Sequence, residues 1–118
     1  MDSARTRVIE HLPDDLSLLL ERQALELKEL YAERYRGLVL YGSYARDEAD
    51  EGSDVDVLLL LEGKVNTTRE LLRAEEVDWP LSLEAGYTIS LLPVSVEAYQ
   101  RSEQPFLRNA RKEGISLS

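Results

Sequence analysis

Residues 38–57 read LVLYGSYARDEADEGSDVDV, and this stretch decides the fold. Its apolar start, 38–41, ends at Gly42 and is typical of a short buried strand. A short helix or turn and then an acidic loop are expected over residues 43–53. Residues 54–61 are β-branched and leucine-rich, which indicates a second strand. The sequence therefore predicts two consecutive strands joined by a short polar connection.

Gly42 and Ser43 stand where the first strand gives way to the connection. A residue without a Cβ lets the backbone approach a ligand closely, and free amides at a helix start point outward. The Ser43 hydroxyl adds a donor suited to a phosphate oxygen. Arg46 lies one turn further on and carries a forked cationic donor that can reach a polyphosphate. These three residues form the candidate phosphate-binding group.

Asp54 and Asp56 form the second half of the motif. Because they lie two apart on a strand, their carboxylates emerge on one face, roughly 6–7 Å apart. At an effective dielectric of about 20 they repel each other by roughly 2–3 kcal/mol, and a divalent cation bound between them would reverse that cost. Oxygen ligands with no histidine nearby favour Mg²⁺ or Mn²⁺ over zinc. Asp54 and Asp56 are thus the candidate metal ligands and catalytic residues, while Val55, Val57 and Leu59 are expected to face the core.

Helices are predicted before the motif. A short one is expected up to His11, which is interpreted as an ordinary helix-end residue. Pro13-Asp14-Asp15 marks the start of a longer helix, with carboxylates near the positive end of its dipole. Its apolar stripe at helical spacing consists of Leu16, Leu19, Leu20, Ala24, Leu27, Leu30 and Tyr31. Gly37 is the expected end of this helix.

Further elements are predicted after the motif. A helix is expected over 67–77, with one of its two initial threonines as N-cap and with Leu71 and Leu72 facing inward. Trp79-Pro80 is expected to interrupt it before another helical turn over 81–85.

A third strand is expected over 87–94, and Pro93 places its far end at a sheet edge. The remaining elements are helices over 95–99 and 104–112 and a terminal strand over 115–117. Helix and strand thus alternate four times. This order indicates an α/β layered domain, with a small mixed sheet flanked by helices, and one domain spanning residues 1–118.

The composition limits the functions that are open to the chain. The formal net charge of −9 opposes direct, sequence-independent binding to nucleic acid. The absence of cysteine removes a Cys-based zinc site and a thiol nucleophile and fits a reducing cytoplasm. The N-terminus lacks a signal peptide's apolar stretch, and the longest apolar run, 57–61, is too short to span a bilayer. We therefore expect a cytoplasmic protein without a membrane partner. Basic residues near the C-terminus form either a solvated helix face or a docking surface, namely Arg101, Arg108, Arg111 and Lys112.

Gly42-Ser43, ten intervening residues and Asp54-x-Asp56 together resemble the signature of the nucleotidyltransferases related to DNA polymerase β. Three further segments are similar to the small prokaryotic branch called minimal nucleotidyltransferases, namely Tyr-Ala-Arg at 44–46, the turn at 83–87 and the closing segment at 108–117. The resemblance implies a DNA polymerase β-like fold in which Gly42 and Ser43 hold the triphosphate of ATP and Asp54 and Asp56 bind Mg²⁺ or Mn²⁺. The implied reaction is attack of an acceptor hydroxyl on the α-phosphate, with pyrophosphate as leaving group.

The chain departs from this family at one position. Active members carry a third carboxylate on a later core strand, and here the strand over 87–92 contains no acid. Ser90 is the expected occupant of the vacated position, and Glu84, just before the strand, is the alternative source of a carboxylate. Loss of a general base typically slows a reaction by roughly 10²–10⁴-fold.

The resemblance implies three alternative functions. The first is the antitoxin of a toxin–antitoxin pair, which transfers AMP from Mg-ATP to a hydroxyl, a tyrosine of a cognate HEPN-domain ribonuclease toxin. This hypothesis is motivated by the small size and by the lack of a second, substrate-binding domain. The second is a catalytically weakened domain that neutralises its partner by binding alone. The third is a nucleotidyltransferase for small molecules such as aminoglycosides, for which an added acceptor-binding domain is usual.

Overall fold

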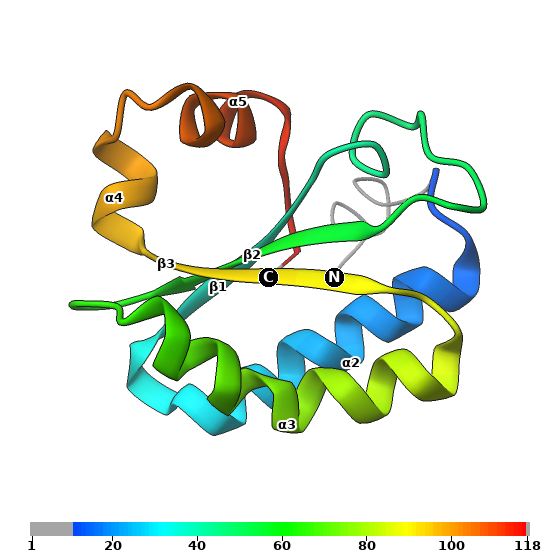
Figure 1. Cartoon of the computed structure of the whole chain (residues 1–118), viewed down its shortest axis with the longest axis horizontal. Coiled ribbons are helices and arrows are strands. Elements are labelled where there is room, and N and C mark those ends of the chain that lie inside the picture. The colour runs from blue at the N-terminus through cyan, green and yellow to red at the C-terminus, as the bar shows by residue number, and fades with distance from the viewer. Residues whose placement is uncertain (1–10, 118) are drawn as a thin grey trace, which may run out of the picture.

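The computed structural model describes residues 11–117, which form a four-stranded sheet with helices on both faces (Figure 1). The strands lie in the order β3-β2-β1-β4. They are β1 (Tyr35–Tyr41), β2 (Val55–Leu61), β3 (Ile89–Ser95) and β4 (Ile115–Ser116). β1 pairs antiparallel with β2 and β4, whereas β2 and β3 run parallel. The predicted α/β class with a small mixed sheet is confirmed.

Helices α2 and α3 lie side by side on one face of the sheet, and α4 and α5 cover the other face (Figure 1). The helical elements are α2 (Asp14–Tyr31), the 3₁₀ turn η1 (Ala32–Arg34), α3 (Thr67–Ala85), α4 (Val96–Arg101) and α5 (Pro105–Glu113). No helix within residues 11–117 is both long and apolar enough to cross a membrane. The short helix expected before His11 lies outside the described residues, and a single domain over all 118 residues stays a prediction.

The core has two parts, one on each face of the sheet. Val55, Val57 and Leu59 pack with α2 and α3, as predicted. The alternate residues Leu58 and Leu60 are equally buried and pack under α5. The face of β2 that carries Asp56 is therefore not polar along its whole length. Beyond Asp56 that face is apolar, because α5 covers it and each buried leucine contributes about 1.5–3 kcal/mol.

The predicted stripe of α2 is buried except for the half-buried Leu30, but the helix does not end at Gly37. It ends at Tyr31, because Ala32 adopts a left-handed backbone with φ 52° and leads into η1. Gly37 lies within β1 at φ 139°, where the register with β2 shifts between Tyr35 and Gly37. This glycine therefore accommodates a strand irregularity instead of ending a helix.

Helix α3 differs most from its prediction. Its N-cap is Asn66, whose side chain accepts from the Arg69 amide, and not one of the two following threonines. Leu72 is exposed, and Leu71 is only half-buried. The helix also continues through Pro80, whose ring faces solvent. Buried residues on both sides of Pro80 hold it to α2 and the sheet, namely Glu70, Ala74, Asp78 and Leu81.

The third strand and the C-terminal elements follow the prediction closely. β3 begins at Ile89, later than expected, and is an edge strand, which agrees with the expectation from Pro93. Arg111 donates to the carbonyls of Tyr99 and Ser102 at 2.6 and 2.9 Å. This part of the basic cluster therefore ties α4 to α5.

Candidate active site

Strand pairing brings the two halves of the motif together. β1 and β2 are antiparallel, so the end of β1 meets the start of β2, and Tyr41 pairs with Asp56. Gly42 follows β1 directly, and Asp54 directly precedes β2. The connection over 42–54 arches above this end of the sheet, close to the start of α2 (Figure 1).

Gly42 lies against the carboxylate of Asp56. Its backbone has φ +78°, a left-handed conformation that favours glycine. A Cβ at this position would collide with Asp56 Oδ2 and lie 3.2 Å from its Cγ. The absence of a side chain at Gly42 is therefore what lets the turn and the carboxylate share this space.

The turn after Gly42 exposes amide donors. It closes through three backbone hydrogen bonds, from the Arg46 amide to Gly42 at 3.1 Å, from the Asp47 amide to Tyr44 at 3.3 Å and from the Glu48 amide to Ser43 at 2.8 Å. Among residues 11–117, nothing accepts from the amides of Ser43 and Tyr44. Free amides and a hydroxyl in one turn form a cradle suited to a phosphate. The segment is a turn and not a helix.

The two aspartates repel each other. Asp54 is exposed and Asp56 is half-buried. Burial, with the charge of Asp54, raises the pKa of the Asp56 carboxyl, and Arg46 partly offsets the rise. Burial and the Asp56 charge raise the pKa of Tyr41 to about 12, so this phenol stays protonated at neutral pH. Two adjacent carboxylates at a sheet end fit a hard divalent cation.

Among the described residues, no third acid joins Asp54 and Asp56 in a group placed to hold a metal. Within the described part of the chain, no group of three or more His, Cys, Asp or Glu side chains is placed to hold a metal.

Arg46 is already engaged with carboxylates. It donates from Nε to Glu48 at 2.9 Å and from Nη1 to Glu113 of α5 at 3.1 Å. These bonds raise the pKa of its guanidinium. Because ion pairs exposed to solvent are weak, a polyphosphate can compete for this side chain.

Of the two candidates for the third acidic position, the fold brings Ser90 to the aspartates. Ser90 of β3 pairs in register with Asp56 of β2, and register partners in parallel strands share a face. Glu84 lies on α3, on the other side of the sheet, and is exposed beside Arg22, with 3.5 Å between the charged atoms. Glu84 therefore offers no carboxylate to this pair.

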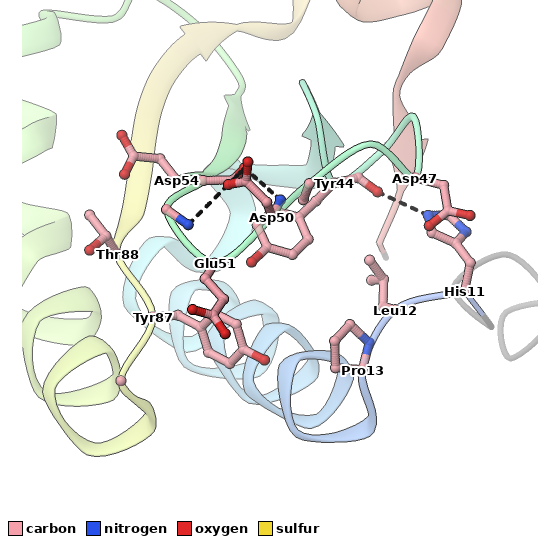
Figure 2. A pocket seen from close by; sticks show the side chains of 14 residues that line it. His11, Leu12, Pro13, Tyr44, Asp47, Asp50, Glu51, Asp54, Tyr87 and Thr88 are labelled. Carbon is pink, nitrogen blue, oxygen red and sulfur yellow. Dashed lines mark hydrogen bonds between the residues drawn. The ribbon is translucent and has the colours of Figure 1, made fainter.

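A cleft of about 640 Å³ adjoins Asp54. Figure 2 shows Asp54 at one end of the cleft and His11 at the other, with the loop over 47–53 along one side. Asp50 fixes this loop, since its carboxylate accepts from the Gly52 amide at 3.0 Å. The described residues that line the cleft include acids but neither Lys nor Arg, so their chemistry differs from that of the Gly42–Ser43 turn.

Three cleft residues escape prediction from the sequence. His11, interpreted as an ordinary helix-end residue, donates from Nε2 to the Tyr44 carbonyl at 2.9 Å. Tyr44 and Tyr87 meet edge to face with ring centroids 6.4 Å apart, and the Tyr87 hydroxyl donates to Asp15 at 3.0 Å. No local sequence signal marks these residues, because they come from three separate connecting segments that only the tertiary fold brings together.

The sequence matches a known family and two curated relatives. The family described as "Nucleotidyltransferase domain" matches residues 20–116. Both relatives are from Methanocaldococcus jannaschii. "Putative protein adenylyltransferase MJ0604" is 30% identical over 92 residues, which cover 77% of this chain and 86% of that protein. "Putative protein adenylyltransferase MJ0126" is 25% identical over 103 residues, which cover 86% and 92%.

Solved structures share the fold at low identity. A toxin-antitoxin with AMP-PNP has a TM-score of 0.59 at 13% identity, covering 90% of this chain and 73% of that chain. A "putative nucleotidyltransferase from Sulfolobus solfataricus" has a TM-score of 0.58 at 12% identity, covering 96% and 81%. A mutant of the toxin-antitoxin MntA-HpeT has a TM-score of 0.56 at 16% identity, covering 83% and 72%. At these identities the likeness is one of fold.

Proposed function

This chain belongs to the nucleotidyltransferase domain family, and from that membership we propose that it transfers AMP from ATP to a hydroxyl of a partner protein, acting as the antitoxin of a toxin–antitoxin pair. The family resemblance drawn from the sequence is thereby confirmed. The observation that carries the proposed reaction is the packing of Gly42 against the carboxylate of Asp56, so that the turn with the free Ser43 and Tyr44 amides adjoins that carboxylate.

The turn holds the triphosphate in this proposal. The free amides of Ser43 and Tyr44 and the Ser43 hydroxyl donate to phosphate oxygens. Arg46 exchanges its carboxylate partners for the polyphosphate. The acceptor oxygen then forms a bond to the α-phosphorus, the bond from that phosphorus to the β-phosphate bridging oxygen breaks, and pyrophosphate leaves. The hydroxyl proton passes to solvent, since the residue nearest the aspartates on β3 is Ser90 and not an acid.

Asp54 and Asp56 are the residues that would hold a divalent cation. Their mutual repulsion and the burial of Asp56 favour a cation of high charge density, Mg²⁺ or Mn²⁺. When bound, such an ion neutralises phosphate charge and orients the triphosphate. The same proposal assigns the site to Gly42, Ser43, Arg46, Asp54 and Asp56.

The acceptor is a protein side chain in this proposal. Two relatives carry the name protein adenylyltransferase, and two structures with the same fold are toxin-antitoxin complexes. The finer assignment is a tyrosine of a HEPN-domain toxin that is encoded by the adjacent gene. We place the reaction in the cytoplasm, where ATP and Mg²⁺ are both available.

The test is an AMP-transfer assay with the protein encoded by the adjacent gene as acceptor. The acceptor's intact mass is measured after incubation with ATP and Mg²⁺. We expect a gain of one or more AMP units with the wild type and none with Asp56→Asn. Glu62→Gln is the matched control, because Glu62 is an exposed carboxylate just past the other end of β2.

The outcomes separate the alternatives. AMP transfer that survives Asp56→Asn would overturn the assigned site. No transfer by the wild type, with a stable complex still formed, would favour neutralisation by binding alone. The pairing of Asp56 with Ser90, and not with an acid, is the observation that favours this second candidate. In that case Asp54→Asn and Asp56→Asn would leave neutralisation in cells intact.

A further inference from the structure

A second hollow lies between α3 and the edge strand β3. It is a groove of about 550 Å³ on the α3 side of the sheet. Its apolar lining comes from Leu71, Trp79, Leu83, Tyr87, Ile89 and Leu91. Trp79 and Leu83 are 62% and 64% exposed, and Leu72, near Trp79 on the same helix, is 65% exposed. So much exposed apolar surface in one place is typical of a protein contact.

The strand that forms one wall of this groove is open on its outer side. β3 pairs with β2 alone among the described strands, so its other edge has no strand partner. An open edge of this kind accepts an extended segment of another protein as an added strand. Pro93 has no amide donor, which confines full pairing to residues 89–92, the half of β3 nearest the aspartates.

The groove is acidic, and this charge indicates what kind of segment can bind in it. Glu75 and Asp78 line it and Glu76 lies beside Trp79, while the lining within residues 11–117 includes neither Lys nor Arg. Asp78 is nearly buried and accepts from Gln23. The complementary partner therefore combines apolar side chains with Lys or Arg.

The groove is continuous with the candidate active site. Gly86, Tyr87 and Thr88 line both the groove and the cleft beside Asp54. A segment lying along β3 consequently leads to the aspartates.

We propose that the groove between α3 and β3 is the docking site of the acceptor protein, which adds an extended, basic and apolar segment along the open edge of β3. This inference rests on the proposed function, since it supplies the surface that presents the acceptor hydroxyl to Asp54 and Asp56. Trp79 and Leu83 contact the apolar side chains of the segment, and the exposed carboxylate of Glu75 pairs with its cations.

The test compares variants by calorimetric titration with the protein encoded by the adjacent gene. Leu83→Arg places a cation in the groove, and Glu75→Lys reverses a charge at its rim. Leu18→Arg is the matched control, because Leu18 on α2 is 66% exposed and lies outside the groove. We expect the two groove variants to weaken the complex by about tenfold or more. The control should stay near wild-type affinity, and Mg-ATP affinity should be unchanged in all three.

Hydrogen exchange supplies a second readout. Amides within 89–92 should gain protection when the acceptor protein is bound to the wild type. Wild-type affinity in both groove variants, or no added protection at 89–92, would overturn the docking site. Either result would leave the proposed function intact, as long as AMP transfer is observed and depends on Asp56. If the wild type itself fails to bind the adjacent-gene protein, both the proposed partner and the docking site fall.

Discussion

Gly42 is under two constraints, a left-handed backbone and close contact with Asp56, and a comparison with Gly63 separates them. Its φ of +78° disfavours any side chain, and its neighbour Asp56 leaves no room for one. Gly63 has a similar φ of +85° but open space around it. Alanine at either position should cost about 1–2 kcal/mol of stability through the left-handed backbone alone.

Only Gly42→Ala should also displace Asp56, and we expect AMP transfer to fall by about a hundredfold. Gly63→Ala should keep wild-type activity. Initial rates of transfer and thermal melting of both variants give the comparison. Equal activities would show that the close approach to Asp56 is unimportant.

Ser90 is the position at which a third carboxylate can be restored. It pairs with Asp56 and is exposed, so a larger side chain fits without repacking the core. Since a general base typically contributes roughly 10²–10⁴-fold, Ser90→Asp should raise the rate of AMP transfer by about tenfold or more. Ser90→Asn has the same shape without the charge and is the control. If both variants transfer AMP at the same rate, the serine does not occupy the vacated acidic position.

Asp78 destabilises the fold at neutral pH. Burial, with the nearby charge of Glu75, raises its pKa from 3.8 to about 6, although the bond from Gln23 opposes the rise. A raised pKa means that the folded state holds its proton more tightly than the unfolded state. Stability should therefore fall as pH rises from about 4 to 6 and then stay level. The difference between these pKa values corresponds to at most roughly 3 kcal/mol.

Asp78→Asn removes this penalty and offers a partner to Gln23 Oε1, a buried oxygen with no hydrogen bond among the described residues. We expect a gain of about 1–3 kcal/mol at pH 7 and a flat profile between pH 4 and 6. Urea unfolding across that range measures both. Glu76→Gln, an exposed change two residues away, should alter stability little. A destabilised Asp78→Asn variant would contradict the inference that the buried charge of Asp78 destabilises the fold.

At the scale of elements, one buried carboxylate of α3 connects this helix to the end of α2 and to η1. Glu70 is 3% exposed and accepts from the Tyr31 hydroxyl at 3.0 Å and from Arg34 Nη1 at 3.1 Å. Arg34 also donates to the carbonyls of Glu62 and Lys64. One arginine of η1 thus connects α2, α3 and the end of β2.

Removing Arg34 leaves the buried carboxylate of Glu70 without its cationic partner. Arg34→Ala should therefore lower the free energy of unfolding by about 3–5 kcal/mol. Arg36→Ala is the matched control, because Arg36 forms an exposed pair with Glu62 at 3.1 Å. Exposed pairs contribute about 0–1 kcal/mol. Chemical denaturation measures the two variants. Similar losses would mean that Glu70 does not depend on Arg34 for its burial.

At the scale of the whole molecule, the last described residue packs into the core cluster beneath α2. Leu117 is buried in the cluster that includes Leu16 and Leu20 of α2, and its amide donates to Leu38 at 2.8 Å. We expect Leu117→Ala to cost about 2–5 kcal/mol. The exposed change Leu18→Ala should stay within about 0.5 kcal/mol.

The loss in Leu117→Ala should shift one cooperative transition, because the two ends share a cluster. Far-ultraviolet circular dichroism and the fluorescence of Trp79 should therefore give the same midpoint. Separate midpoints would show that the C-terminal strand unfolds independently of the rest of the molecule.

Local chemistry was enough to predict the motif and most elements. Gly42, Ser43 and the two aspartates are separated by a short connection, and hydrophobic periodicity marks α2, β1 and β2 directly. These features depend on neighbours along the chain, which is why the sequence alone determined the family, the mixed sheet and the candidate site.

Long-range packing decided the rest. Pro80 remains inside α3 because residues before and after it are buried against the same surface. Ser90 reaches Asp56 through parallel pairing across a helix, and His11 reaches Tyr44 from another element. Contacts of this kind are set by how separate elements pack, and such packing leaves no periodic or local trace in the sequence.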